Sequence, residues 1–146
     1  MSKAESADLI LKLYDLRREE VMRKGRTFMG SYFPESIDDI VATFMDDQKS
    51  AYMRMVITYW DNAAVLVNHG AIDEDMFNEM NGEHIAVFCK IYPFLGEIRE
   101  KFNNPKFLMN LEKLIMRMPD AENMLEARRK SGKEWMEARQ AMSKNA

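Results

Sequence analysis

Apolar residues recur every three or four positions along most of the chain, which is the spacing of one face of an α-helix. No stretch alternates apolar and polar residues between turn residues, as a half-buried strand does. The pattern therefore predicts an all-α, single-domain bundle of five to six helices. The predicted helices cover about residues 3–24, 37–45, 49–69, 83–102, 105–118 and 119–146.

The segment 49–69 is the most strongly patterned of these. Val56 and Tyr59 lie on its main apolar stripe, and Trp60 lies on a second apolar strip beside it. A helix that is apolar around most of its circumference is normally surrounded by other elements. We therefore expect this helix at the centre of the bundle, ended by Gly70.

The first helix and the segment after it are delimited by short local motifs. Ser2 and Glu5 have the spacing of a capping box, which predicts that a helix begins there. Gly25 is expected to end that helix. The following stretch, 26–35, is predicted to be a loop, although Phe28, Tyr32 and Phe33 make it unusually apolar.

Proline marks an irregularity in the segment 83–102. Pro93 removes one backbone hydrogen bond and clashes with the preceding turn, at a cost of about 3 kcal/mol in a regular helix. We expect either a kink near Lys90 or a break into two helices. Pro105 is expected to occupy the first position of the helix that follows.

The last segment, 119–146, differs from the others in its charge. From Asp120 onwards it has six bases and five acids, and its few large apolar residues include Trp135 and Met136. Ser131 and Gly132 are expected to interrupt the helix. Two arrangements remain open: the segment packs through its first turns and then projects, or it frays.

Length and charge limit the classes of function. A chain of 146 residues fits one domain, and 21 bases against 24 acids leave no basic surface for a phosphate backbone, so nucleic acid is not an expected partner. The longest stretch without a charged residue is 62–72, which is shorter than the roughly 20 residues of a membrane-spanning helix. The first residues lack the features of a leader peptide, which favours a cytoplasmic location.

The chain offers few residues for catalysis or metal binding. Cys89, His69 and His84 are its only thiol and imidazole groups, which excludes a disulfide framework or a cysteine-rich metal site within one chain. The acidic run that begins at Asp73 lacks the glycine and glutamate of a calcium loop, and a helix cap explains it. We therefore expect no catalytic residue, no metal and no cofactor.

A block in the middle of the chain resembles a known family. The segment from Tyr59 to Asp75, with Phe77 and the apolar helix up to Glu100, is similar to a block of about 40 residues in a family of uncharacterised bacterial proteins grouped as a domain of unknown function. The resemblance implies a helical bacterial domain. Many members have a membrane helix before this block, whereas this chain has a charged helix there, so membrane attachment does not carry over. The family supplies no catalytic residues.

The leading functional hypothesis is a non-enzymatic module that binds protein, as a homo-oligomer or as an adaptor or regulator of another bacterial protein. Fourteen methionines could form an adaptable surface, and exposed apolar patches often mark interfaces. The candidate interface residues are Phe28, Tyr32, Phe33, Trp135 and Met136.

The alternative hypothesis is a small-molecule sensor or enzyme. Its pocket would lie between the helices 49–69 and 83–102, where Pro93 and Gly96 loosen the packing. The candidate pocket residues are Tyr59, Trp60, Asn81, His84 and Tyr92.

Overall fold

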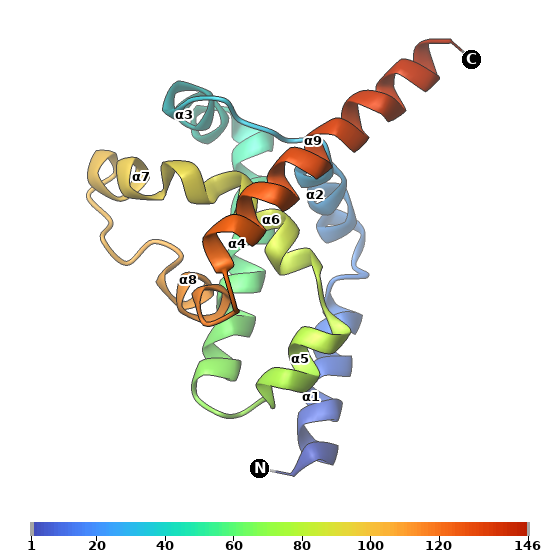
Figure 1. Cartoon of the computed structure of the whole chain (residues 1–146), viewed down its shortest axis with the longest axis vertical. Helices are drawn as coiled ribbons and strands as arrows, with labels where there is room; N and C mark the ends of the chain where they lie inside the picture. Colours follow the sequence, from blue (N-terminus) through green and yellow to red (C-terminus); the bar gives the residue numbers. More distant parts are fainter. Residues whose placement is uncertain (1, 146) are drawn as a thin grey trace.

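The computed structural model describes residues 2–145, and every regular element in that range is helical (Figure 1). The elements are α1 (Lys3–Leu16), α2 (Glu20–Gly30), α3 (Ile37–Met45), α4 (Asp47–Asn68), α5 (Glu74–Met80), α6 (Glu83–Ile91), the 3-10 turn η1 (Tyr92–Phe94), α7 (Leu95–Lys101), α8 (Met109–Met116) and α9 (Ala121–Lys144). The predicted all-α class is confirmed. The predicted number of five to six helices is too low, because two of the predicted helices are each divided in two and the short helix α5 follows Gly70.

Helix α4 forms the centre of the packing. It lies against α2, α3 and α8 and also contacts α5 and α6 (Figure 1). Ala63 and Ala64 are fully buried, and their small side chains let neighbouring helices approach closely. Trp60 on the same helix is only 1% exposed. The helix therefore has the central position that its apolar circumference predicts.

The predicted first helix is interrupted near Arg17. The Ser2 capping box is present, with Glu5 N donating to Ser2 Oγ at 3.1 Å. Helix α1 nevertheless ends at Leu16, and a new helix begins after Glu19, whose carboxylate accepts from the amides of Val21 and Met22. A carboxylate that satisfies two free amides can start a helix without a Ser or Thr cap.

Gly25 does not end a helix, contrary to expectation. It lies within α2, where a Cβ atom would be 3.1 Å from Val56 Cγ2 and 3.3 Å from the carbonyl oxygen of Tyr52. The glycine therefore serves the close approach of α2 to α4. The predicted loop 26–35 is accordingly wrong in its first half, because α2 continues to Gly30.

The irregularities in the second half of the chain lie at its prolines and around α8. Helix α6 ends at Ile91, and Pro93 lies in the short 3-10 turn before α7, so the chain breaks there into two helices. Helix α8 begins at Met109 and not at Pro105. Helix α9 runs through Gly132 without the expected interruption.

The first turns of α9 pack against α6, and Ala121 and Leu125 are its buried residues. Further along, Lys133 pairs with Glu35 at 2.7 Å, and the C-terminal end of the helix projects beyond the other elements (Figure 1). Within residues 2–145, no helix combines the length and the apolar character needed to cross a bilayer.

Candidate functional site

Four of the five residues predicted to line a pocket lie together, at the point where α4, α5 and α6 meet. The ring of Trp60 lies 4.8 Å from that of Tyr59 and 5.5 Å from that of His84. Asn81 follows α5 and donates to the carbonyl oxygen of Phe77 at 3.0 Å. Tyr92 lies elsewhere, because its ring packs on Phe88 at 5.6 Å and its hydroxyl donates to Glu122 on α9.

Polar side chains that the sequence analysis did not identify close this cluster. Glu83 accepts a hydrogen bond from Trp60 Nε1 at 3.1 Å and forms an ion pair with Arg26 at 2.9 Å. Arg17 donates to Asn81 Oδ1 at 3.0 Å and lies 5.3 Å from the centre of the Trp60 ring. Through these bonds, the connection between α1 and α2 is held against α4 and the beginning of α6.

His84 is the one imidazole in this cluster, and it is completely buried. Its Nε2 lies 3.3 Å from Asn78 Oδ1, and its Nδ1 has no partner among the residues that the structure describes. Burial lowers the pKa of His84 from 6.5 to about 4, and the positive charges of Arg128 and Arg17 add to this effect. At neutral pH it is a neutral ring packed against Trp60 and Phe77, which supports a structural role.

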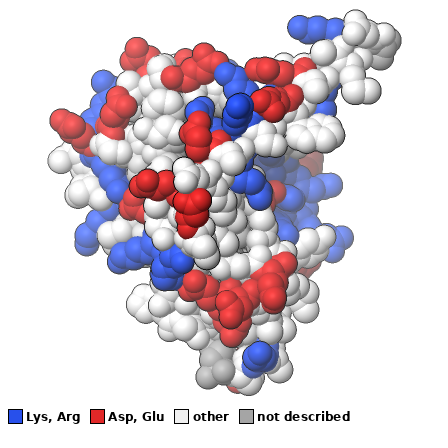
Figure 2. Space-filling model, in the orientation of Figure 1, with Lys and Arg blue, Asp and Glu red and all other residues white. Residues whose placement is uncertain are grey.

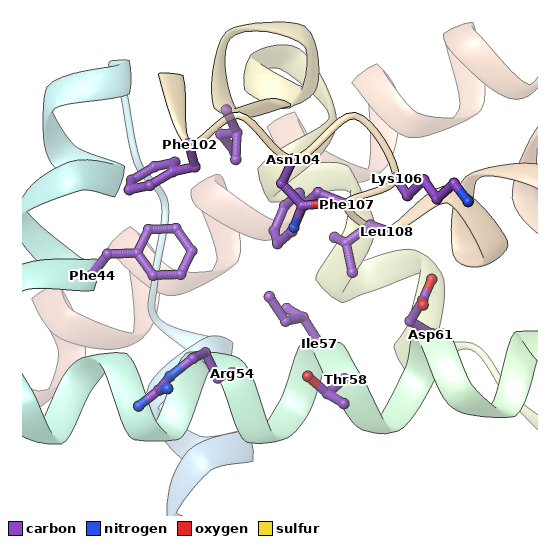
Figure 3. Close-up of a pocket in the computed structure, with 11 residues that line it drawn as sticks. Phe44, Arg54, Ile57, Thr58, Asp61, Phe102, Asn104, Lys106, Phe107 and Leu108 are labelled. Carbon is purple, nitrogen blue, oxygen red and sulfur yellow. The ribbon is translucent and has the colours of Figure 1, made fainter. Parts of the chain in front are cut away.

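A hollow of about 420 Å³ lies next to α4, on the side that faces α7 and the connection between α7 and α8 (Figure 3). The size is within the range of small-molecule sites. Its position, between the segments 49–69 and 83–102, agrees with the alternative hypothesis, but its lining residues are different ones. They are Phe44, Arg54, Ile57, Thr58, Asp61, Ile98, Phe102, Asn104, Lys106, Phe107 and Leu108.

The charged side chains around this hollow differ in whether a partner within the chain balances their charge. Asp61 accepts from the amide of Leu111 at 2.9 Å and from Asn110 Nδ2 at 3.3 Å, so the beginning of α8 balances its charge. Arg54 donates through Nε to the carbonyl oxygen of Ser50 at 3.3 Å. Among residues 2–145, neither Arg54 nor Lys106 forms an ion pair.

One wall of the hollow is a strained loop. Asn103 and Leu108 have backbone φ angles of 50° and 52°, which are unusual for residues other than glycine, above all for leucine. Such residues cost of the order of 1–3 kcal/mol each and persist where surrounding contacts hold them. Arg99 provides these contacts, because its guanidinium donates to the carbonyl oxygen of Phe107 at 2.9 and 3.0 Å and pairs with Glu112 at 2.9 Å.

The predicted interface residues fall into two groups. Phe28 and Tyr32 stack on each other at 5.2 Å and are half-buried. Phe33 is also half-buried: its ring lies 4.4 Å from Lys90 Nζ, and it packs against Gly132 on α9. All three aromatic residues therefore pack within the chain.

The second group lies on residues 130–144 of α9, here called the C-terminal arm. Trp135 is 69% exposed, whereas Met136 is half-buried. Met142, which was not among the predicted residues, is 75% exposed. Uncharged atoms make up most of the projecting end of this helix (Figure 2). An open groove of about 890 Å³ runs between the arm and the end of α2. Its lining residues are Thr27, Gly30, Ser31, Gly132, Trp135, Met136, Arg139, Gln140, Ser143 and Lys144.

Comparison with known proteins identifies a family but no activity. A family model described as "Domain of unknown function (DUF4760)" matches residues 3–118. The match confirms the resemblance to a domain-of-unknown-function family and extends it well beyond residues 59–100. The hollow beside α4 lies inside the matched region, and α9 lies outside it. No curated protein and no solved structure matches the chain.

Proposed function

We propose that this chain, which belongs to the DUF4760 family, is a non-enzymatic interaction module whose partner is a second copy of itself, bound through the C-terminal arm. The observation that carries the proposal is the exposure of Trp135 and Met142. These residues are seven positions apart and therefore lie on one face of the helix. An exposed aromatic and thioether stripe of this kind is typical of a helix that packs against another protein surface.

The groove beside the arm supports a helix as the occupant. Thr27 and Gly30 of α2, together with Ser31 directly after it, give one side of the groove a lining of small residues, which lets another helix approach closely. In a two-fold symmetric dimer, each arm would lie in the groove of the other copy, because such an interface uses the same surface twice. Trp135 and Met136 would then be covered in both copies.

Charge favours a second copy as that occupant. The arm carries four bases and two acids, whereas the rest of the chain carries 17 bases and 22 acids. The net positive arm is therefore attracted over long range to the net negative body of another copy, which favours their encounter. The groove itself contains Arg139 and Lys144, so the contact within it rests on the apolar and small residues.

Sedimentation equilibrium of the full chain at several concentrations tests the proposal. We expect a reversible dimer, and we expect the double variant Trp135→Glu with Met142→Glu to sediment as a monomer. Met45→Glu is the matched control, because Met45 is equally apolar and 79% exposed but lies on α3, away from the arm.

Circular dichroism of each variant establishes that its helices are retained. A wild-type chain that stays monomeric at the highest concentration overturns self-association. A dimer that persists in the double variant, or that is lost in Met45→Glu as well, removes the arm from the interface.

A further inference from the structure

We infer that the hollow between α4 and the α7–α8 connection binds a small anionic molecule with an aromatic or aliphatic body. This inference goes beyond the proposed self-association and does not depend on it, because the hollow and the C-terminal arm share no residue. The ligand class follows from the size of the hollow, its aromatic lining and Arg54, which forms no ion pair among residues 2–145.

The apolar part of the ligand is indicated by three phenylalanines, one on α3 and two on the connection between α7 and α8. Phe44 of α3 lies 5.1 Å from the ring of Phe102 and 6.5 Å from the ring of Phe107, in edge-to-face arrangements. Phe102 remains 44% exposed. Rings set around an open hollow offer their faces to a flat or aliphatic body, and covering Phe102 would remove further apolar surface from water.

The anionic part is indicated by Arg54. Among residues 2–145 only its Nε is used, for the bond to the Ser50 carbonyl, so its terminal nitrogens are available to a carboxylate, sulfonate or phosphate. Arg54 lies on the Phe44 side of the hollow, whereas Asp61 lies on the Lys106 side (Figure 3). The negative charge of Asp61 is therefore far from the position where Arg54 would hold an anion.

The construction of the wall agrees with a site that is formed before the ligand arrives. Leu108 is buried and lines the hollow in its strained left-handed conformation. Arg99 holds this loop through the carbonyl oxygen of Phe107 and fixes it to α8 through Glu112. Side chains held in this way lose little freedom on binding, which favours affinity.

The test uses two fluorescent probes that differ in charge. Anilinonaphthalene sulfonate has an aromatic body with a sulfonate, and phenylnaphthylamine has a similar body without it. Titration into the full chain is expected to give saturable binding of one molecule per chain, with tighter binding of the sulfonate. The same titration of Trp135→Glu is expected to be unchanged, which separates this site from the exposed arm.

Two variants assign the roles of the lining residues. Arg54→Gln is expected to weaken binding of the sulfonate by about tenfold and to leave the neutral probe unchanged, because an ionic hydrogen bond is lost. Phe102→Ala is expected to weaken both probes by about fivefold. Arg23→Gln is the matched control, since Arg23 is an exposed arginine on α2 without an ion pair among residues 2–145.

Arg54 and Phe102 are both exposed, so these variants are expected to keep the melting temperature of the wild type, which circular dichroism checks. Absence of saturable binding of either probe overturns the site. Equal binding of the two probes, or a loss in Arg54→Gln that Arg23→Gln reproduces, overturns the assignment of an anionic ligand. Loss of binding in Trp135→Glu would place the probe on the arm instead.

Discussion

The two halves of α9 lie in opposite environments although they belong to one continuous helix. Leu125 in the first half is 1% exposed and packs where α9 contacts α6. Trp135 and Met142 in the second half are 69% and 75% exposed. Helix formation depends on local backbone bonds, whereas burial of a side chain needs a neighbour. The first half packs against α6 of its own chain. In the proposed dimer, the second half packs against another copy.

Stability should therefore respond differently to mutations in the two halves. Leu125→Ala creates a cavity in the core, and we expect it to lower the free energy of unfolding by about 2–5 kcal/mol in urea titrations. Trp135→Ala, measured on the monomer at low concentration, should change it by less than about 0.5 kcal/mol. Similar losses for both substitutions would show that the arm packs against its own domain.

Burial of His84 in the core predicts that stability depends on pH. The pKa of His84 is lowered to about 4, so between pH 6.5 and 4 the unfolded chain takes up a proton that the folded chain does not. The free energy of unfolding should fall over this interval by up to about 3 kcal/mol from this group. His84→Phe should remove that part of the decline, as urea titrations at several pH values would reveal. An identical pH profile for the variant would contradict the burial of a neutral ring.

Lys90, buried near Met29 and Phe33, predicts a second pH dependence at alkaline pH. It is 5% exposed, its Nζ donates to the carbonyl oxygen of Met29, and burial lowers its pKa to about 8. Because the unfolded chain keeps this proton up to a higher pH, stability should rise as the pH increases from 8 to 10.5. Lys90→Met should abolish this rise and, at neutral pH, add about 1–2 kcal/mol, since a desolvated charge is removed and one hydrogen bond is lost. A less stable variant would show that the hydrogen bond and the Phe33 contact outweigh the cost of desolvation.

Truncation of the arm should have the smallest effect on the fold. A chain that ends at Glu134 retains the Lys133–Glu35 ion pair at 2.7 Å and the contact of Gly132 with Phe33. We expect its monomer to unfold within about 0.5 kcal/mol of the full chain, with self-association abolished. Calorimetry and sedimentation of the same sample measure both properties, and a large loss of stability would assign the arm an internal role.

The sequence predicted well those elements whose pattern is long and one-sided. The segment 49–69 corresponds to α4 (Asp47–Asn68) because a helix surrounded by neighbours has apolar residues on most of its circumference. An irregularity at Pro93, either a kink or a break, was predicted for an equally local reason, since the ring of proline is incompatible with a regular helix, and the structure has the break.

Glycine was the least reliable guide. Gly25 and Gly132 were both interpreted as ends or interruptions of helices, and both lie inside helices, where they let Val56 and Phe33 approach. A glycine that ends a helix and one that allows close packing look alike in a single sequence, because the difference is made by a residue far away in the chain.

The hollow beside α4 could be predicted only in part. The sequence analysis expected a pocket between the segments 49–69 and 83–102, but around Trp60 and His84, whereas the hollow is lined mainly by α4 and residues 102–108. The lining residues were missed, since they depend on the left-handed conformation of Asn103 and Leu108 and on the hold of Arg99, and nothing local in the sequence indicates either. The exposure of Trp135, in contrast, was expected from the charged residues around it.

The most direct test of a covered arm is the fluorescence of its tryptophan as a function of concentration. The chain has two tryptophans, of which Trp60 is 1% exposed and Trp135 is 69% exposed in the single chain. We predict that the emission maximum of the wild type shifts to longer wavelength on dilution, as Trp135 returns to water, and that Trp135→Phe shows no shift. An emission spectrum of the wild type that is the same at every concentration would contradict the burial of the arm by a second copy.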